Sequence, residues 1–485
     1  MSLNKKIKNA GKWQSLSVIS LNILQLIYFA IMTRLLLKED YGLMAIVNGT
    51  IGVGNIFIQG GMGSALIQRK DITNKHINGA LQTSILIGLV LYSIFYFLSP
   101  YIAVVYNDSR LDDLIKVSSL NLLLLALNNI SVNLLLKNFR FKNASLVDIT
   151  SNLIGYSIGV YLAMNNYGVW SLVIATLLSS LISTITMFYF APITISLKMH
   201  HKEARELFAF GSGMMLISFS NFLSNKGLNL VFGKIFAQDI LGIYERTSRI
   251  KELPSQFLAS IINKVMFPVM SEIQDENEKL IRIYKFGIGV SNSLMIPITV
   301  FLIFFTAEIV HILMGSNWNE AIIPLQIMFL VLTFSNSGKM TDAVIRSKGL
   351  IYKNVSRKYI FTILIILLSG ILGYLYGING AAVGIVLSYF INYLMMIVLV
   401  KNVFMGSMKE YFLEPLLSGF KLGLYVAVLI IAYKSLFNLW QITDVSMFLI
   451  FILFLVILLI VVLKLKPSML GYYLHTVIKK TLNKG

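Results

Sequence analysis

Long apolar blocks separated by short polar segments dominate the chain. Blocks such as 85–98 and 448–463 contain no charged residue. A helix needs about 20 mostly apolar residues to cross about 30 Å of hydrocarbon. The pattern therefore predicts an all-α polytopic membrane protein with about fourteen transmembrane helices, at residues 13–35, 42–66, 77–98, 114–136, 145–163, 169–190, 209–232, 240–266, 284–306, 321–345, 359–375, 380–400, 412–433 and 445–463.

Composition agrees with this assignment. Hydrophobic residues make up 56% of the chain and charged residues 13%, whereas a soluble domain carries about 25% charged residues. The loops between the predicted helices are too short for a soluble catalytic lobe. Because there is no cysteine, disulfides and thiolate metal sites are excluded. We expect no enzymatic activity, no catalytic residue, no cofactor and no metal site.

The net charge of +19 reflects membrane topology. With the predicted helices, most Lys and Arg residues fall on the side that holds both chain ends. The opposite side carries only Arg34, Lys38, Arg110, Lys234 and Lys434. Basic residues favour the cytoplasmic side of a membrane, so we expect both termini to be cytoplasmic. This distribution argues against nucleic acid as a partner.

The two halves of the chain resemble each other at a shift of about 200 residues. Gly42 aligns with Gly242 at the start of corresponding predicted helices, and at a shift of 209 Tyr167-Gly168 aligns with Tyr376-Gly377. Each repeat holds an even number of helices, so both face the same way, as in transporters whose two bundles rock around a central cavity. We predict pseudo-symmetric six-helix lobes at 1–200 and 201–405, followed by two further helices and a cytoplasmic tail at 406–485.

Polar residues recur on one face of the first two helices in each repeat. In 240–266 the stripe comprises Glu245, Arg249, Glu252 and Gln256, at intervals of three or four residues. Polar side chains inside a bilayer usually face the bundle interior. The resulting candidates for substrate binding are Asn22, Gln25, Asn55, Asn225, Lys226, Glu245, Arg246, Arg249, Glu252 and Gln256.

These residues also have an ordinary structural interpretation. Asn and Gln join helices through hydrogen bonds of about 0.6 kcal/mol. Arg249 could pair with Glu245 or Glu252 along its own helix, and Arg246 could instead reach the outer interface. Charged residues inside a membrane nevertheless favour a functional site. We therefore expect a hydrated, net-positive cavity between the lobes.

Other polar positions have simpler expected roles. Lys339 and Asp342 are spaced for an ion pair along one helix, and Asp148 is placed to cap the helix predicted at 145–163. Pro254 and Pro297 lie within predicted helices and mark bends or hinges.

Several segments resemble Wzx-type polysaccharide repeat-unit flippases of the multidrug/oligosaccharidyl-lipid/polysaccharide exporter superfamily. They are Leu241-Gly242-Ile243-Tyr244-Glu245-Arg246, Phe267-Pro268-Val269-Met270-Ser271, Asp40-Tyr41-Gly42 and Tyr167-Gly168-Val169-Trp170. The resemblance covers nearly the whole chain and is nearest to the colanic-acid and teichuronic-acid exporter subgroup.

This resemblance implies a flippase in the bacterial cytoplasmic (inner) membrane. Its substrate would be undecaprenyl-diphosphate-linked oligosaccharide, carried from the cytoplasmic to the outer leaflet by alternating access. A cationic cavity would suit the diphosphate, since Arg and Lys form strong hydrogen bonds with phosphate oxygens. Membrane lipid, a glycan polymerase and other polysaccharide-assembly proteins are the implied partners, and H⁺ or Na⁺ the implied coupling ion.

Three alternatives stay open at this point. The peptidoglycan-precursor flippase is another relative of the same superfamily, and complementation of its depletion would distinguish it. A multidrug exporter of the same superfamily would be expected to carry acidic coupling residues in its first lobe, where the predicted helices contain only Asp148, at a helix edge. A polytopic glycan polymerase would need a sizeable extramembrane loop for its catalytic groups.

Overall fold

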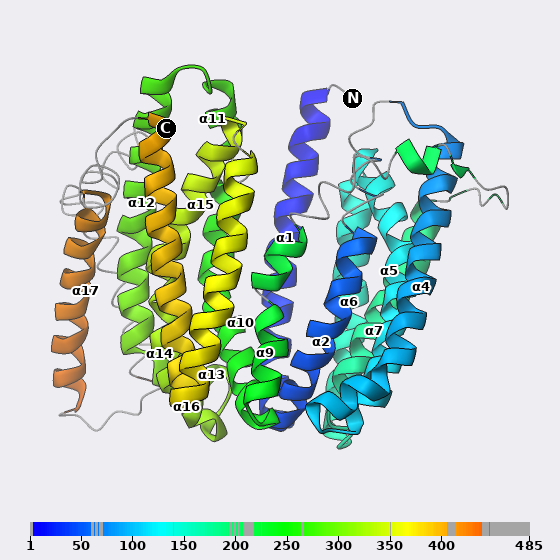
Figure 1. Cartoon of the computed structure of the whole chain (residues 1–485), viewed down its shortest axis with the longest axis horizontal. Coiled ribbons are helices and arrows are strands. Elements are labelled where there is room, and N and C mark those ends of the chain that lie inside the picture. The colour runs from blue at the N-terminus through cyan, green and yellow to red at the C-terminus, as the bar shows by residue number, and fades with distance from the viewer. Residues whose placement is uncertain are drawn as a thin grey trace. The chain divides into compact units, whose positions relative to one another are not determined.

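The computed structural model describes most of the chain, and every element in the described part is helical (Figure 1). The described residues are 3–59, 63, 66, 71–138, 140–191, 193, 196, 200, 201, 203–206, 218–224, 226–262, 266–349, 351–404, 414–438 and 446.

The chain divides into two compact units, Met1–Gly242 (unit 1) and Ile243–Gly485 (unit 2). The division falls inside helix α10 (Gln238–Ile261), which begins in unit 1 and continues in unit 2. The lobe boundaries expected from the repeat, near residues 200 and 405, remain a prediction.

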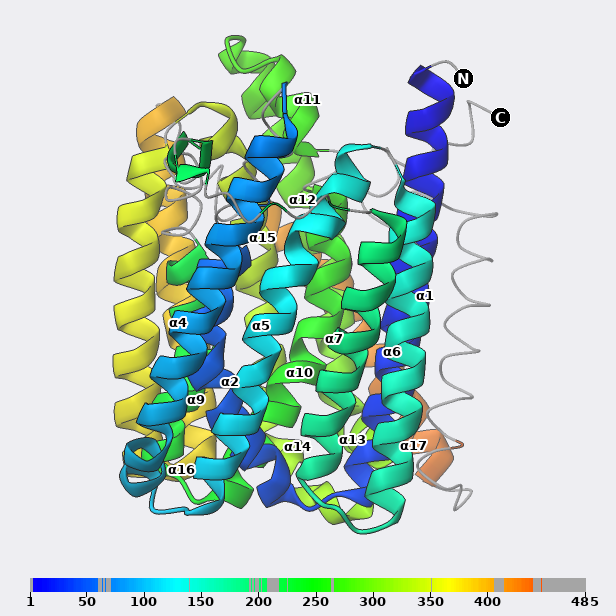
Figure 2. The ribbon, with the colours of Figure 1, turned by 90° about the vertical axis from the view of Figure 1, so that its right-hand side faces the viewer.

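Unit 1 is a helical bundle in which α2 is the most enclosed helix. Its helices are α1 (Leu3–Leu35), α2 (Lys38–Gln59), α4 (Asn74–Tyr106), α5 (Arg110–Lys137), α6 (Phe141–Met164), α7 (Trp170–Phe190) and α9 (Gly227–Ile235). Helix α5 packs against α4 and α7, and α6 packs against α7 and α1 (Figure 2). Residues 41–47 of α2 are all buried, against α5, α9 and α4. By contrast α4 exposes Phe97, Tyr101 and Val104, as expected of a helix that faces acyl chains.

Unit 2 is built from α10 after Gly242, α11 (Phe267–Glu272), α12 (Asn277–Phe304), α13 (Thr306–Leu313), the 3₁₀ helix η2 (Ser316–Ala321), α14 (Ile322–Phe329), α15 (Val331–Ser347), α16 (Ile351–Phe404) and α17 (Glu414–Asn438). Helix α12 lies between α15 and α17, and α15 packs against α16 (Figure 1). Met270, Tyr284, Met340 and Tyr393 belong to the apolar core that joins α11, α12, α15 and α16.

The class of protein expected from the sequence is confirmed: the chain is a multi-pass helical membrane protein. Within the described residues, nine helical segments are long and apolar enough to cross a membrane. The helices predicted at 359–375 and 380–400 form the single element α16, which is broken at Tyr376 and Gly377. Gly377 has φ +65°, a conformation that glycine adopts without steric cost. The last predicted helix, 445–463, lies outside the described residues apart from Ser446.

Two glycines 200 residues apart make a reciprocal contact in unit 1. A Cβ added to Gly42 would overlap the backbone oxygen of Gln238, and one added to Gly242 would overlap the backbone oxygen of Lys38. Lys38 and Gln238 are themselves 200 residues apart and begin α2 and α10. The first turns of these helices therefore use equivalent backbone atoms, as expected of an internal repeat.

Two local expectations have different outcomes. Pro254 and Pro297 lie inside α10 and α12 as predicted, where each ring removes one helical hydrogen bond. The capping role expected for Asp148 is wrong, because α6 begins at Phe141 and places Asp148 within the helix. The apolar pattern showed only the membrane-embedded part of α6 and missed its polar first turns.

Candidate functional site

The described site residues predicted in unit 1 lie on α1, on α2 and directly before α9. Asn22 is exposed and Gln25 half-buried on α1, Asn55 is half-buried on α2, and Lys226 is exposed at the residue that precedes α9. Asn225 lies outside the described residues. The polar atoms of this unit therefore come from separate helices, as the sequence pattern suggested.

The predicted site residues of unit 2 all lie on α10. Arg246 binds the carboxylate of Glu245, with its Nη2 and Nε atoms 2.5 and 2.6 Å from Glu245 Oε2. The long side chain of Arg246 therefore bends back to its neighbour, and its reach to the outer membrane interface stays a prediction. Arg249 and Glu252 are half-buried and Gln256 is exposed.

The candidate residues are thus divided between the units. Asn22, Gln25, Asn55 and Lys226 belong to unit 1, and the five residues of α10 belong to unit 2. The cavity expected between the two lobes stays a prediction.

Lys339 of α15 ties α15 to α10 inside unit 2. Its ammonium donates to the Ser255 backbone oxygen at 2.7 Å, to Ser255 Oγ at 2.5 Å and to Asn336 Oδ1 at 3.3 Å. Ser255 Oγ in turn donates to Asn336 Oδ1 at 3.1 Å, and the Glu252 carboxylate acts electrostatically on Lys339. We call these four residues the lysine seam. The expected pair of Lys339 with Asp342 is therefore wrong, because Lys339 points across the helix interface and not along its own helix.

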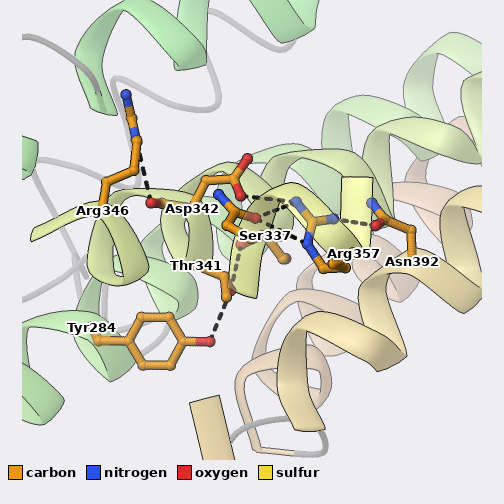
Figure 3. A network of polar contacts seen from close by, with 8 residues as sticks. Tyr284, Ser337, Thr341, Asp342, Arg346, Arg357 and Asn392 are labelled. Carbon is orange, nitrogen blue, oxygen red and sulfur yellow. Dashed lines mark hydrogen bonds and ion pairs between the residues drawn. The ribbon is translucent and has the colours of Figure 1, made fainter. Parts of the chain in front are cut away.

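Asp342 is instead bound by Arg357, which is buried in unit 2 with 5% of its side chain exposed. The Arg357 Nη2 lies 3.0 Å from Asp342 Oδ1 and 2.7 Å from Asn354 Oδ1, and its Nη1 donates to Asn392 Oδ1. In Figure 3 the guanidinium lies between Asp342 and Asn392. Arg357 and Asn392 lie on opposite sides of the break in α16, so this one side chain joins α15 to both segments of α16.

Tyr284 and Ser337 extend polar contacts through the same region. The Tyr284 hydroxyl lies 3.0 Å from Thr341 Oγ1 (Figure 3). Ser337 Oγ donates to Asn292 Oδ1 at 2.6 Å. These bonds tie α12 to α15. These hydrogen bonds offset part of the cost of burying polar groups between the helices.

Sequence reasoning missed Arg357 for a specific reason. The helix predicted at 359–375 begins at Ile351 in the structure, so Arg357 was assigned to a cytoplasmic loop as a topology signal. Asp342 within a predicted helix could have pointed to a missing buried cation, because an unpaired carboxylate is costly in a bilayer.

Unit 1 contains a small polar pocket between α2, α5 and α7, which we call the amide pocket. Its cavity volume is about 40 Å³, and its polar lining comes from Asn48, Asn55, Ser118, Asn121 and Thr176. The sequence analysis identified Asn55 on α2. It did not include Ser118 and Asn121, which lie on α5.

Fold and polar interior together define a polytopic helical membrane protein. The chain superposes on the lipid II flippase MurJ in an inward closed conformation with a TM-score of 0.71, covering 97% of this chain and 98% of MurJ at 18% identity. It also superposes on an inward-facing multidrug resistance transporter of the MATE family and MOP superfamily, with a TM-score of 0.58 over 80% of this chain and 98% of that one, at 16% identity.

The family model described as polysaccharide biosynthesis protein matches residues 31–323, more than half of the chain, and the chain belongs to this family. It is 24% identical to the lipopolysaccharide biosynthesis protein WzxC of Escherichia coli K12 over 85% of both chains. It is 22% identical to the teichuronic acid biosynthesis protein TuaB of Bacillus subtilis 168, over 68% of this chain and 69% of TuaB. The resemblance to Wzx-type flippases is confirmed.

Proposed function

We propose that this protein is a flippase for undecaprenyl-diphosphate-linked oligosaccharide repeat units in the synthesis of a cell-surface polysaccharide. The proposal rests chiefly on one observation: a member of the polysaccharide biosynthesis family matches a lipid II flippase over nearly its whole length. It moves its substrate from the cytoplasmic to the outer leaflet by alternating access. It acts as a transporter and not as a polymerase.

The proposed recognition chemistry follows from the substrate. A diphosphate carries strong acceptor oxygens, and Arg and Lys are the side chains that bind such groups by charge-assisted hydrogen bonds. Lys226 and Arg249 are our first candidates for this role. The Glu245 carboxylate already binds Arg246.

We further propose the cellular setting that the sequence indicated. The chain lies in the bacterial cytoplasmic membrane with both termini in the cytoplasm. H⁺ or Na⁺ drives the cycle, and a glycan polymerase with other polysaccharide-assembly proteins receives the exported units.

The decisive experiment is made in a deletion strain that has no redundant flippase. Lipid-linked repeat units should accumulate on the cytoplasmic leaflet, and the wild-type gene should restore surface glycan. Arg249→Gln and Lys226→Gln, at wild-type protein levels, should each lower glycan export at least tenfold, about 1.4 kcal/mol of lost interaction. Lys279→Gln, at an exposed residue of α12, is the matched control.

Other outcomes would redirect the assignment. Normal surface glycan in the deletion strain, or polymer formed by the purified protein, would refute the flippase proposal. A drug-susceptibility assay on the same strains tests the multidrug alternative, which predicts loss of resistance with unchanged glycan.

A further inference from the structure

Three side-chain oxygens that line the amide pocket of unit 1 are buried without a protein hydrogen-bond partner in the described part of the chain. They are Asn55 Oδ1 on α2, and Ser118 Oγ and Asn121 Oδ1 on α5. All three residues contribute to the wall of the same cavity. Buried oxygens without a donor are rare in folded proteins. Three around one cavity point to a shared donor other than the described residues.

The size of the cavity limits what that donor can be. Its volume is about 40 Å³, and one water molecule needs about 10–15 Å³ by this measure. The pocket therefore holds about three waters and is far too small for a sugar ring. Even two of these waters bring four O–H donors, enough for the three oxygens.

The charge of the lining argues for a neutral occupant. Of the described residues that form the wall, none is an Asp, Glu, Lys or Arg. A bare cation taken out of water into this site would lack a carboxylate to offset its desolvation, which is the largest cost of burying a charge. Water satisfies the same oxygens without that cost.

The lysine seam of unit 2 provides an internal comparison. Ser255 follows Asn55 by 200 residues, and its oxygens accept hydrogen bonds from the Lys339 ammonium. Glu252, which acts electrostatically on that ammonium, follows Gly52 by 200 residues. In the lysine seam the donor is therefore the Lys339 side chain, which has the Glu252 carboxylate to balance its charge. In unit 1 the position that corresponds to Glu252 is Gly52, which has no side chain.

We propose that the amide pocket is an internal hydration site. It binds about three water molecules that donate to Asn55, Ser118 and Asn121 and that link α2 to α5. The proposal does not depend on the substrate proposed above, and it gives Asn55 a role other than the substrate binding predicted from the sequence.

Met44 provides a built-in reporter, because it lines the pocket while only 9% of it is exposed. X-ray radiolysis of the full-length protein in lipid nanodiscs converts bound water to hydroxyl radicals, which oxidise adjacent methionines. Mass spectrometry should find Met44 oxidised several-fold faster than Met32 and Met187, which are 1% and 0% exposed and do not line the pocket.

Substitutions then separate pocket water from bulk water. Asn55→Leu with Asn121→Leu fills the pocket and should reduce Met44 oxidation to the rate of Met32. Ser118→Val, a milder change, should reduce it in part. Asn152→Leu on α6, which does not line the pocket, should leave it unchanged. Gel filtration and circular dichroism verify folding.

Two results would overturn the proposal. One is Met44 oxidation that equals that of Met32 in the wild type, or that is unaffected by both pocket variants. The other is strong protection of Met44 in sodium chloride relative to choline chloride, which would assign the pocket to a cation and not to water.

Discussion

Corresponding seams in the two units are held together by different chemistry. In unit 1 the α2–α5 seam presents amides and hydroxyls, and Asn129 Nδ2 donates to the backbone oxygen of Ile58 at 2.9 Å. In unit 2 the α10–α15 seam is bridged by the Lys339 ammonium, and Arg357 joins α15 to α16. The corresponding helices of the two units are therefore joined by different side chains.

The two units also differ in where their ion pairs lie. The ion pairs described for unit 1 include Arg110 with Glu39 at 3.1 Å and with Asp108 at 2.8 Å, at the ends of helices. Unit 2 places ion pairs against its core, as with Arg357 and Asp342, or with Lys434 of α17 and the buried Glu308 of α13. A buried ion loses its hydration, so removing one partner leaves the other at high cost. We therefore expect unit 2 to depend on single residues and unit 1 on many weak contacts.

The largest expected effect is at Arg357. Arg357→Met removes the guanidinium bound by Asp342, Asn354 and Asn392 and should destabilise the protein by about 3–5 kcal/mol, as for other broken buried pairs. Denaturant unfolding in detergent measures this change. Arg346→Met, at an exposed residue whose Nε donates to the Asp342 backbone oxygen, should cost far less. Equal losses for the two variants would remove the contrast between buried and peripheral charge.

Lys339→Met should have the next largest effect. It leaves Ser255 and Asn336 without their shared donor, at about 1–3 kcal/mol. Adding Glu252→Gln to Lys339→Met should restore part of the lost stability, because it removes a negative charge that Lys339 no longer balances. Lys348→Met, which gives up one contact with Asn277, is the matched control. If the changes in the free energy of unfolding of the two single variants simply add in the double variant, Glu252 plays no part in the lysine seam.

The smallest effect is expected at Arg110, where unit 1 carries charge at a helix end. Arg110→Gln should cost less than about 1 kcal/mol, and added salt should reduce that cost. Hydrogen bonds from Arg110 hold the pKa of Asp108 below its usual range. The pair therefore contributes above the usual carboxyl pKa and is lost as the pH falls through the lowered pKa. The Tm of the variant should therefore lie below that of the wild type at neutral pH, and the two should have the same Tm in strong acid.

The sequence was a good guide to the fold because hydropathy and repeat spacing are properties of whole helices. It predicted the membrane class, most helix positions and the polar character of α2 and α10. It was a poor guide to partners, because these depend on side-chain direction across an interface. Lys339 and Asp342 have ideal spacing for each other, yet each binds a residue from another segment. Arg246 and Glu245 should diverge by helix geometry, yet they pair.

The amide pocket illustrates a second limit. Asn55 belongs to a recognisable stripe, whereas Ser118 and Asn121 become meaningful only when α5 is packed against α2. A three-helix cavity has no signature in any one helix.

The reciprocal glycine contact restricts how this chain can change. The atoms that approach Gly42 and Gly242 most closely are main-chain carbonyl oxygens, which every amino acid carries. Shortening a nearby side chain therefore cannot create room for a methyl group at either position. Only displacement of an entire helix end could do so, and the reciprocal partner would have to move with it.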